Sequence, residues 1–203
     1  YQTALLQATR MDSVQTRVTQ IVNQRNQVLG TAAFQRTRVD ARSLFGFEDT
    51  TTASASDIAV MWNRRISQFL SVRMRYQYTE QTTDLVPYFA HRTNVSGNAG
   101  ITGNDQNPEN WGPPSLVFST VAGLADARPS FTRNRMNGGW FEGYIFRGRN
   151  EFQIGADVKR NNIDIQSQQD PRGSFTFTGA LTGLDFADFL LGTPAASSIA
   201  YGN

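Results

Sequence analysis

The residues that follow Asn150 alternate between apolar and polar side chains, and this alternation strongly limits what the chain can fold into. One parity carries Phe152, Ile154, Ala156 and Val158, and the other carries Glu151, Gln153, Asp157 and Lys159. A period of two residues is the signature of a β-strand with one apolar and one polar face. Gly148 and Asn150 favour a tight turn before this strand, so Trp140 to Ile163 predicts a β-hairpin.

The apolar face of such a hairpin needs a cover, which is either a second protein layer or lipid. The chain is 39% hydrophobic, and it has no run of the ~18 apolar residues that a membrane helix needs. A transmembrane barrel remains possible because its lipid-facing residues alternate with lumen-facing ones, which weakens the hydropathy signal.

Composition excludes several function classes. With 203 residues the chain is long enough for one large or two small domains, and it contains no cysteine, which removes disulfides, zinc–thiolate sites and thiol nucleophiles. Its 19 basic and 17 acidic residues give a net charge of +2 and no electrostatic basis for nucleic-acid binding.

Strand patterns and turn residues predict three hairpins, at about 12–39, 57–80 and 131–164. The short turns fall at 23–26, 66–68 and 148–150, whereas long connections fall at 40–56, 80–130 and 165–203. Residues 1–11 fit either a short helix around Ala4 to Ala8 or the end of a loop. Within the later connections we expect a short strand or helix in 116–127, a small ribbon at 174–179 and one or two helical turns at 183–192.

Short and long connections alternate along the chain, so a meander would have all its short turns at one end. Outer-membrane barrels have this arrangement, with short periplasmic turns and long extracellular loops. Strands of ~11 residues or more also suit a tilted membrane crossing. Aromatic side chains are expected to form two interfacial girdles, with Tyr76 and Tyr78 near the long loops and Tyr144, Phe146 and Phe152 near the short turns.

Four segments resemble the barrel portion of TonB-dependent outer-membrane transporters, in particular the large Oar-like kind that carries a carboxypeptidase-regulatory-like domain. They are NPENWGPPSLVFS (107–119), RGRNEFQIGADVKR (147–160), SQQDPRGSFTFTG (167–179) and FADFLLGTP (186–194). The resemblance extends from about Asp12 onward. It implies a barrel of 22 strands in the bacterial outer membrane, closed by an N-terminal plug and energised by the TonB complex for import of a bulky nutrient.

The expected fold is therefore all-β, an antiparallel up-and-down meander of about six long strands that forms part of a barrel wall, with residues 1–203 as a fragment of it. The plug and the energy-coupling segment are expected outside this chain. Its partners would be outer-membrane lipid, the remainder of the barrel and plug, the TonB complex through that plug, and an unidentified nutrient. The alternative is a soluble β-rich extracellular binding or adhesion module.

Polar residues on the strand faces are the candidate substrate contacts in the lumen. They are Arg73, Arg75, Gln77, Glu151, Gln153, Asp157 and Lys159. Lumen-facing side chains tune selectivity in such barrels, although the simpler interpretation is that these residues form cross-strand ion pairs that only keep the wall wet and rigid. In the longest loop, Trp111 with Pro113 and Pro114 either offers a stacking surface or pins its loop.

No catalytic or cofactor-binding set is recognisable, so we expect the chain not to be an enzyme and to bind no cofactor. His91 is the only histidine and has no companion ligands at metal-binding spacing. The segment SGNAGITGNDQN lacks the alternating acidic ligands of a calcium loop. We therefore predict no metal site.

Overall fold

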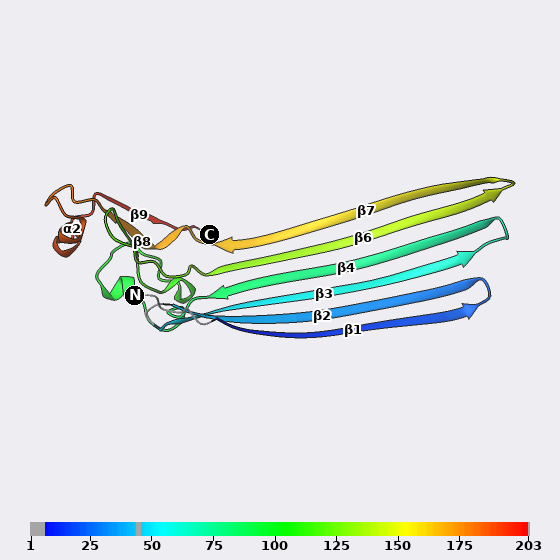
Figure 1. Ribbon diagram of the computed structural model, residues 1–203, viewed down its shortest axis with the longest axis horizontal. Helices are drawn as coiled ribbons and strands as arrows, with labels where there is room; N and C mark the ends of the chain where they lie inside the picture. The colour runs from blue at the N-terminus through cyan, green and yellow to red at the C-terminus, as the bar shows by residue number, and fades with distance from the viewer. Residues whose placement is uncertain (1–6, 44–45, 203) are drawn as a thin grey trace.

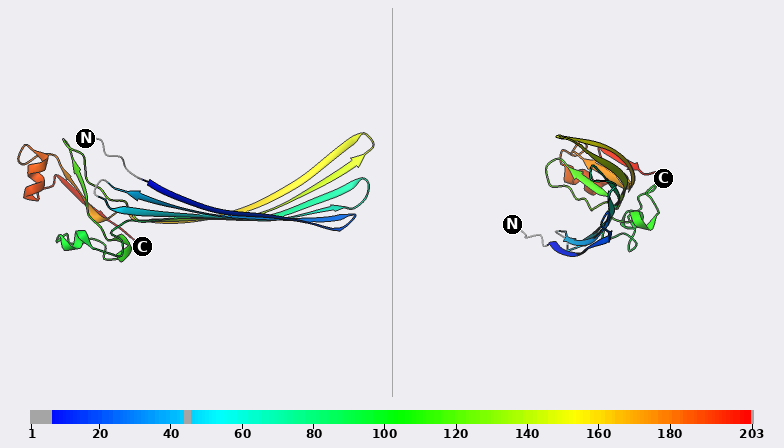
Figure 2. Two further views of the ribbon diagram at one scale, coloured as in Figure 1. Left: turned by 60° about the horizontal axis from the view of Figure 1, so that its bottom comes forward. Right: turned by 90° about the vertical axis from the view of Figure 1, so that its right-hand side faces the viewer.

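The computed structural model describes residues 7–43 and 46–202, which form a long antiparallel sheet with a smaller module at one end (Figure 1). The sheet contains, in spatial order, β1 (Gln7–Asn23), β2 (Asn26–Arg42), β3 (Glu48–Arg65), β4 (Leu70–Val86), β6 (Ser130–Arg147) and β7 (Asn150–Ser167). Each strand runs antiparallel to its neighbours, which confirms the predicted meander of six long strands. Seen along the strands the sheet curves like a trough (Figure 2), and β1 and β7 are its edges, so the described strands do not close into a barrel.

The strands are longer than the sequence predicts. Each has 17 or 18 residues, against the ~11 that a membrane crossing needs. The short turns at 24–25, 66–69 and 148–149 all lie at one end of the sheet (Figure 1). Gly148 has a φ of 63°, a conformation that glycine adopts at no steric cost.

The prediction of a long connection at 40–56 is wrong. β2 continues to Arg42 and β3 already begins at Glu48, so residues 48–56 are strand. The segment looked irregular because its threonine, serine and alanine side chains show no contrast between apolar and polar positions. Threonine is nevertheless β-branched and favours strands, and these residues pair on both sides with β2 and β4.

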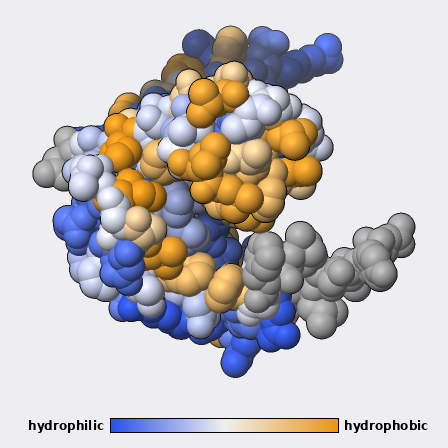
Figure 3. Space-filling view, turned by 90° about the vertical axis from the view of Figure 1, so that its left-hand side faces the viewer, coloured by the Kyte–Doolittle hydropathy of each residue, from blue (hydrophilic) through white to orange (hydrophobic). Residues whose placement is uncertain are grey.

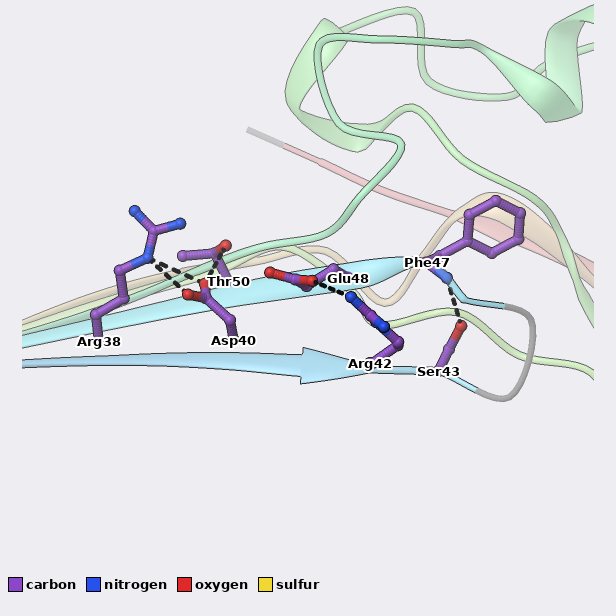
Figure 4. A network of polar contacts seen from close by, with 7 residues as sticks. All are labelled: Arg38, Asp40, Arg42, Ser43, Phe47, Glu48 and Thr50. Carbon is purple, nitrogen blue, oxygen red and sulfur yellow. Dashed lines mark hydrogen bonds and ion pairs between the residues drawn. The ribbon is translucent and has the colours of Figure 1, made fainter. Parts of the chain in front are cut away.

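Polar contacts fix the loop end of the β2–β3 hairpin (Figure 4). Arg38 forms an ion pair with Asp40 at 3.0 Å, and Asp40 also accepts a hydrogen bond from the Thr50 hydroxyl at 2.8 Å. Arg42 pairs across the hairpin with Glu48 at 3.3 Å. Of these contacts, Thr50–Asp40 and Arg42–Glu48 join the two strands beside the short connection between them.

The remaining connections at this end, 87–129 and the residues after Ser167, build the loop module. It contains α1 (Val95–Asn98), the 3-10 turn η1 (Pro108–Asn110), β5 (Ser115–Phe118), β8 (Asp170–Phe177), α2 (Asp185–Leu191) and β9 (Ala196–Ala200). β8 lies between β5, to which it is parallel, and β9, to which it is antiparallel. The ribbon expected at 174–179, the helix at 183–192 and the short strand in 116–127 are thus present as β8, α2 and β5. The helix considered around Ala4 to Ala8 falls mostly outside the described residues, and β1 begins at Gln7.

Aromatic rings form the core of the loop module. The ring centroids of Phe118 and Phe177 lie 5.6 Å apart, and Phe189 from α2 meets both edge-on at 5.6 and 5.4 Å. Phe186 completes the cluster. The apolar side chains of Leu184 and Leu190 remain exposed, and seen from the loop end such residues gather on one side of the module (Figure 3).

Candidate functional site

The register of the large sheet sorts its side chains into two faces, since directly paired residues lie on the same face. One face, here called the outer face, carries a set of large apolar residues toward the short turns. This apolar band consists of Val14, Val18, Val28, Phe34, Ile58, Val60, Trp62, Leu70, Val72, Met74, Tyr76, Tyr78, Phe141, Ile145, Phe152, Ile154 and Val158. The opposite, inner face is mostly polar over the same length.

The apolar band is the more exposed of the two faces. On the central strand β3, Ile58 and Val60 of the outer face are 40% and 48% exposed, whereas Ala59 between them on the inner face is only 5% exposed. Side chains crowd on the concave side of a curved sheet, so the inner face is the concave one. No other described helix or strand packs broadly on the apolar band. Because burial of apolar area yields about 25 cal/mol per Å², a bare face of this size requires an apolar surrounding.

The apolar band crosses the strands obliquely. Counted from the loop end of each strand, the first residue of the apolar band is Val14 on β1, Ile58 on β3 and Val158 on β7. Following the pairs across the sheet, Val158 is level with Val18 of β1, which lies four residues beyond Val14. Between β1 and β7 the loop-side limit of the apolar band therefore shifts by four residues along the strands, about 14 Å, while the five strand spacings add up to about 24 Å across the sheet. This corresponds to an angle of roughly 30°, close to the 35–45° by which barrel strands tilt in a membrane. A level lipid layer against tilted strands explains the oblique limit.

The strands extend well beyond the apolar band on the loop side. On β4 the band runs from Leu70 to Tyr78, about 27 Å along the strand, and the remaining part of the outer face is mostly polar. Its charged residues include Arg36, Arg38, Asp40, Glu80, Asp84, Arg133, Arg135 and Asp164. Arg135 and Asp164 form an ion pair of 2.9 Å there. The loop half of the sheet thus suits water on its outer face.

The predicted aromatic girdles are correct in part. Tyr76 and Tyr78 lie on the outer face near the loop-side limit of the apolar band, and Phe152 lies at its turn-side limit. Tyr144 and Phe146 instead lie on the inner face, because the two-residue turn after Arg147 pairs them with Gln153 and Glu151. The even-numbered residues of β7 therefore face the same way as the odd-numbered residues of β6.

All seven predicted lumen contacts lie on the inner face. The register places Arg73, Arg75, Gln77, Glu151, Gln153, Asp157 and Lys159 there together. Arg73 Nε donates to Asn63 Oδ1 at 3.1 Å, and its Nη1 lies 3.5 Å from Glu142. The Arg75 guanidinium stacks over the Trp140 ring at 4.3 Å from its centroid.

Ion pairs on this face are exposed and add little stability. Arg73 and Glu142 pair across strands, and Lys159 approaches Asp157 along β7 at 3.5 Å, with the side chains of Lys159 and Asp157 more than half exposed. Exposed pairs of this kind contribute about 0–1 kcal/mol. The inner face therefore presents charged groups to water or to a solute in the trough.

Trp111 is held within its loop. Its indole Nε1 donates to the Gln106 carbonyl at 3.1 Å, and the ring is half-buried. His91, in the same loop, is exposed with a positive φ of 59°. Across residues 7–43 and 46–202 there is no group of three or more histidine, cysteine, aspartate or glutamate side chains that could hold a metal.

A crevice of about 650 Å³ separates this loop from the loop-side ends of β4, β6 and β7. Asp84, His91, Glu109 and Gln166 contribute polar groups to its lining, and Phe131 contributes a ring. Its volume lies in the range of small-molecule sites, about 300–1,000 Å³. The crevice was not foreseen from the sequence.

Arg172 of β8 anchors the loop module. Its guanidinium donates to the Asp126 carboxylate and the Ala127 carbonyl, both at 2.8 Å, and to the Asn110 carbonyl at 3.0 Å. Both side chains of the Arg172–Asp126 pair are more than nine-tenths buried. Burial raises the pKa of Asp126, an effect that the Arg172 charge opposes.

Two aspartates fix α2. The buried Asp185 carboxylate accepts hydrogen bonds from the Thr120 hydroxyl and amide, and the buried Asp188 carboxylate accepts from the Thr182 hydroxyl and amide. The hydrogen bond from the Thr120 hydroxyl, and next the one from the Thr120 amide, lower the pKa of Asp185 below its usual value. The hydrogen bond from the Thr182 hydroxyl likewise lowers the pKa of Asp188. Neither aspartate was singled out from the sequence, although acidic residues spaced three apart at a helix start are a recognisable signal.

Acidification is therefore expected to loosen α2. A carboxyl group with a lowered pKa in the folded state stabilises the fold above its unfolded pKa, and this contribution disappears as the pH falls below about 4. Amide hydrogen exchange of 181–192 should be faster below about pH 4 than at pH 6, after correction for the intrinsic pH dependence of exchange. The paired strands β3 and β4 serve as the control. Unchanged protection of α2 would contradict this role of Asp185 and Asp188.

Comparison with known proteins identifies the family. The family model described as "Outer membrane beta barrel domain" matches residues 1–203. Searches of curated proteins and of solved structures give no match. Among the described residues no helix is long and apolar enough to cross a membrane.

The family match agrees with the exposed oblique band and with the polar concave face. It contradicts the alternative of a soluble extracellular module, because it assigns the chain to the bacterial outer membrane. The apolar band is then the lipid-facing surface and the inner face lines the lumen. We conclude that the chain belongs to the outer membrane beta barrel domain family and forms barrel wall in the bacterial outer membrane.

Proposed function

We propose that this wall belongs to a TonB-dependent transporter that imports a bulky nutrient. The main supporting observation is that long loops are confined to one end of a lipid-facing wall, where they fold into an ordered module beside a ligand-sized crevice. The segments that resemble Oar-like transporters include parts of that module, namely 107–119, 167–179 and 186–194.

In this proposal the loop module captures the nutrient outside the cell. Trp111, which follows the lining residue Asn110 in the chain, would offer ring surface for stacking, since its indole nitrogen is already satisfied by Gln106. Arg75, Asp157 and Lys159 on the inner face would contact polar groups of the solute as it passes. The chain performs no chemical reaction and binds no cofactor in this role.

The remaining parts of the transporter would be a plug inside the barrel and further strands to a total of 22. Six strands cannot close a barrel whose smallest form has ~8. The TonB complex would act through the plug, which moves to release the bound nutrient. This assignment accounts for a wide, shallow trough whose inner face carries charges of both signs.

Uptake is expected to depend on energy from the inner membrane. In a strain that expresses the full-length protein, import of fluorescently labelled oligosaccharides, oligopeptides and metal chelates would be compared with that in the deletion strain. We expect at least one probe to accumulate only when the protein is present, and a protonophore to reduce its uptake to the deletion level. Uptake that survives the protonophore would indicate a passive channel and contradict the proposal.

A further inference from the structure

A basic pocket of about 430 Å³ lies at the short-turn end of the sheet. Four arginines line it: Arg25 from the β1–β2 turn, Arg64 and Arg65 from the end of β3, and Arg73 from β4. The other lining residues are neutral, and none of the lining residues carries a carboxylate. A cavity of this volume is large enough for a small ligand or several side chains.

The positive charge of the pocket is largely uncompensated. Glu142 pairs with Arg73 at 3.5 Å and also accepts a hydrogen bond from the Tyr144 hydroxyl at 2.8 Å. The ion pairs formed within residues 7–43 and 46–202 do not include Arg25, Arg64 or Arg65. Three guanidinium groups therefore lack a carboxylate partner in the part of the chain described.

Neighbouring amides hold parts of the pocket in place. Asn63 accepts a hydrogen bond from Arg73 Nε at 3.1 Å, and Asn23 accepts from the backbone amide of Arg25 and the side chain of Asn26, both at 2.9 Å. The Arg65 amide donates to the Arg25 carbonyl at 2.8 Å, which ties the turn to β3. Groups fixed before binding lose less entropy when a ligand arrives.

The pocket opens mainly toward the lumen. Asn63, Arg65 and Arg73 lie on the inner face by register, whereas Arg64 lies on the outer face with its guanidinium 5.8 Å from the centroid of the Trp62 ring. A lipid headgroup would meet Arg64 but not the inner set. The occupant must therefore come from the lumen side.

We propose that this pocket binds an oxyanion, a carboxylate or phosphate group, at the lumen side of the short-turn end. Guanidinium groups match both anions because their parallel N–H donors can bond two oxygens at once. The carboxylate would come from an acidic polypeptide segment and the phosphate from a small solute. Anion binding at this site requires only the barrel wall and does not depend on nutrient uptake.

Calorimetric titration of the full-length protein in neutral detergent at an ionic strength of about 0.1 M tests this site. Inorganic pyrophosphate and a hexaglutamate peptide serve as probes. The variant Arg25→Gln/Arg65→Gln is expected to bind the preferred probe about tenfold more weakly or worse, because charge-assisted hydrogen bonds contribute more than neutral ones. Tighter binding of the peptide assigns a polypeptide segment, and tighter binding of pyrophosphate assigns a small phosphate.

The matched control is Arg147→Gln/Arg149→Gln, which removes the same charge from the β6–β7 turn at the same end, outside the pocket. Its affinity for the probe should stay within about twofold of the unmodified protein, since exposed charges beyond a Debye length of ~10 Å are screened. Equal losses in both variants would show general attraction to a basic rim and overturn the site. Failure of the unmodified protein to bind either probe would also overturn it.

Discussion

Replacing Ile154 with lysine is expected to prevent assembly of the full-length protein in the outer membrane, whereas Gln153→Lys is expected to be tolerated. Ile154 lies in the apolar band and is 62% exposed, while Gln153 lies on the inner face. A lysine that faces lipid near the middle of the membrane costs about 2–4 kcal/mol. The lysine at 153 would face water.

The two substitutions introduce the same side chain at adjacent positions of one strand, so each controls for the other. The measurement is the fraction of protein recovered from outer membranes in a form that resists unfolding by SDS without heating. Equal recovery of both variants would mean that lipid does not contact the apolar band.

Removing the Arg172 side chain should produce the second large effect, in the loop module. In Arg172→Met the Asp126 carboxylate stays buried without its partner, a situation that costs about 3–5 kcal/mol. We expect amide exchange of 124–129 and of β8 to accelerate strongly, while β3 and β4 keep their protection. Hydrogen exchange of the full-length protein measures both regions in one experiment.

Two variants test whether the effect comes from the buried pair. Arg128→Met removes an arginine whose ion pair with Asp170, at 2.9 Å, is partly exposed, and it should cost no more than about 1 kcal/mol. Adding Asp126→Leu to Arg172→Met removes the unpaired charge and should restore part of the protection. If Arg128→Met and Arg172→Met had equal effects, Arg172 would not be the anchor.

The sequence predicts the fold well where side chains alternate strongly and poorly where they are small. In β4 and β7 the contrast between apolar and charged residues predicts that the segment is a strand, which side chains share a face, and where the adjoining turn lies. In 48–56 the threonine, serine and alanine side chains differ too little for the pattern to appear, and only pairing with β2 and β4 reveals the strand. The positions of Tyr144 and Phe146 were missed because the turn, rather than the alternation within β6, sets the register with β7.

Site residues on strands were easier to predict than those in loops. The seven polar strand residues share one face because parity is a local property. The Arg172 anchor depends on contacts with residues 45 to 62 positions away, which a strand pattern does not encode. The basic pocket likewise joins a turn and two strands that are separate in sequence.

The two edge strands run in opposite directions, since β1 heads toward the short turns and β7 returns from them. Inside a hydrocarbon layer each bare edge would leave a row of backbone amides and carbonyls without partners, at several kcal/mol per group. For antiparallel pairing, a strand that is hydrogen-bonded to the free edge of β7 must head toward the short turns, and a strand that is hydrogen-bonded to the free edge of β1 must head away from them. The wall that completes the ring must therefore contribute an even number of strands, and the final seam can close with the same hydrogen-bond pattern as every other pair.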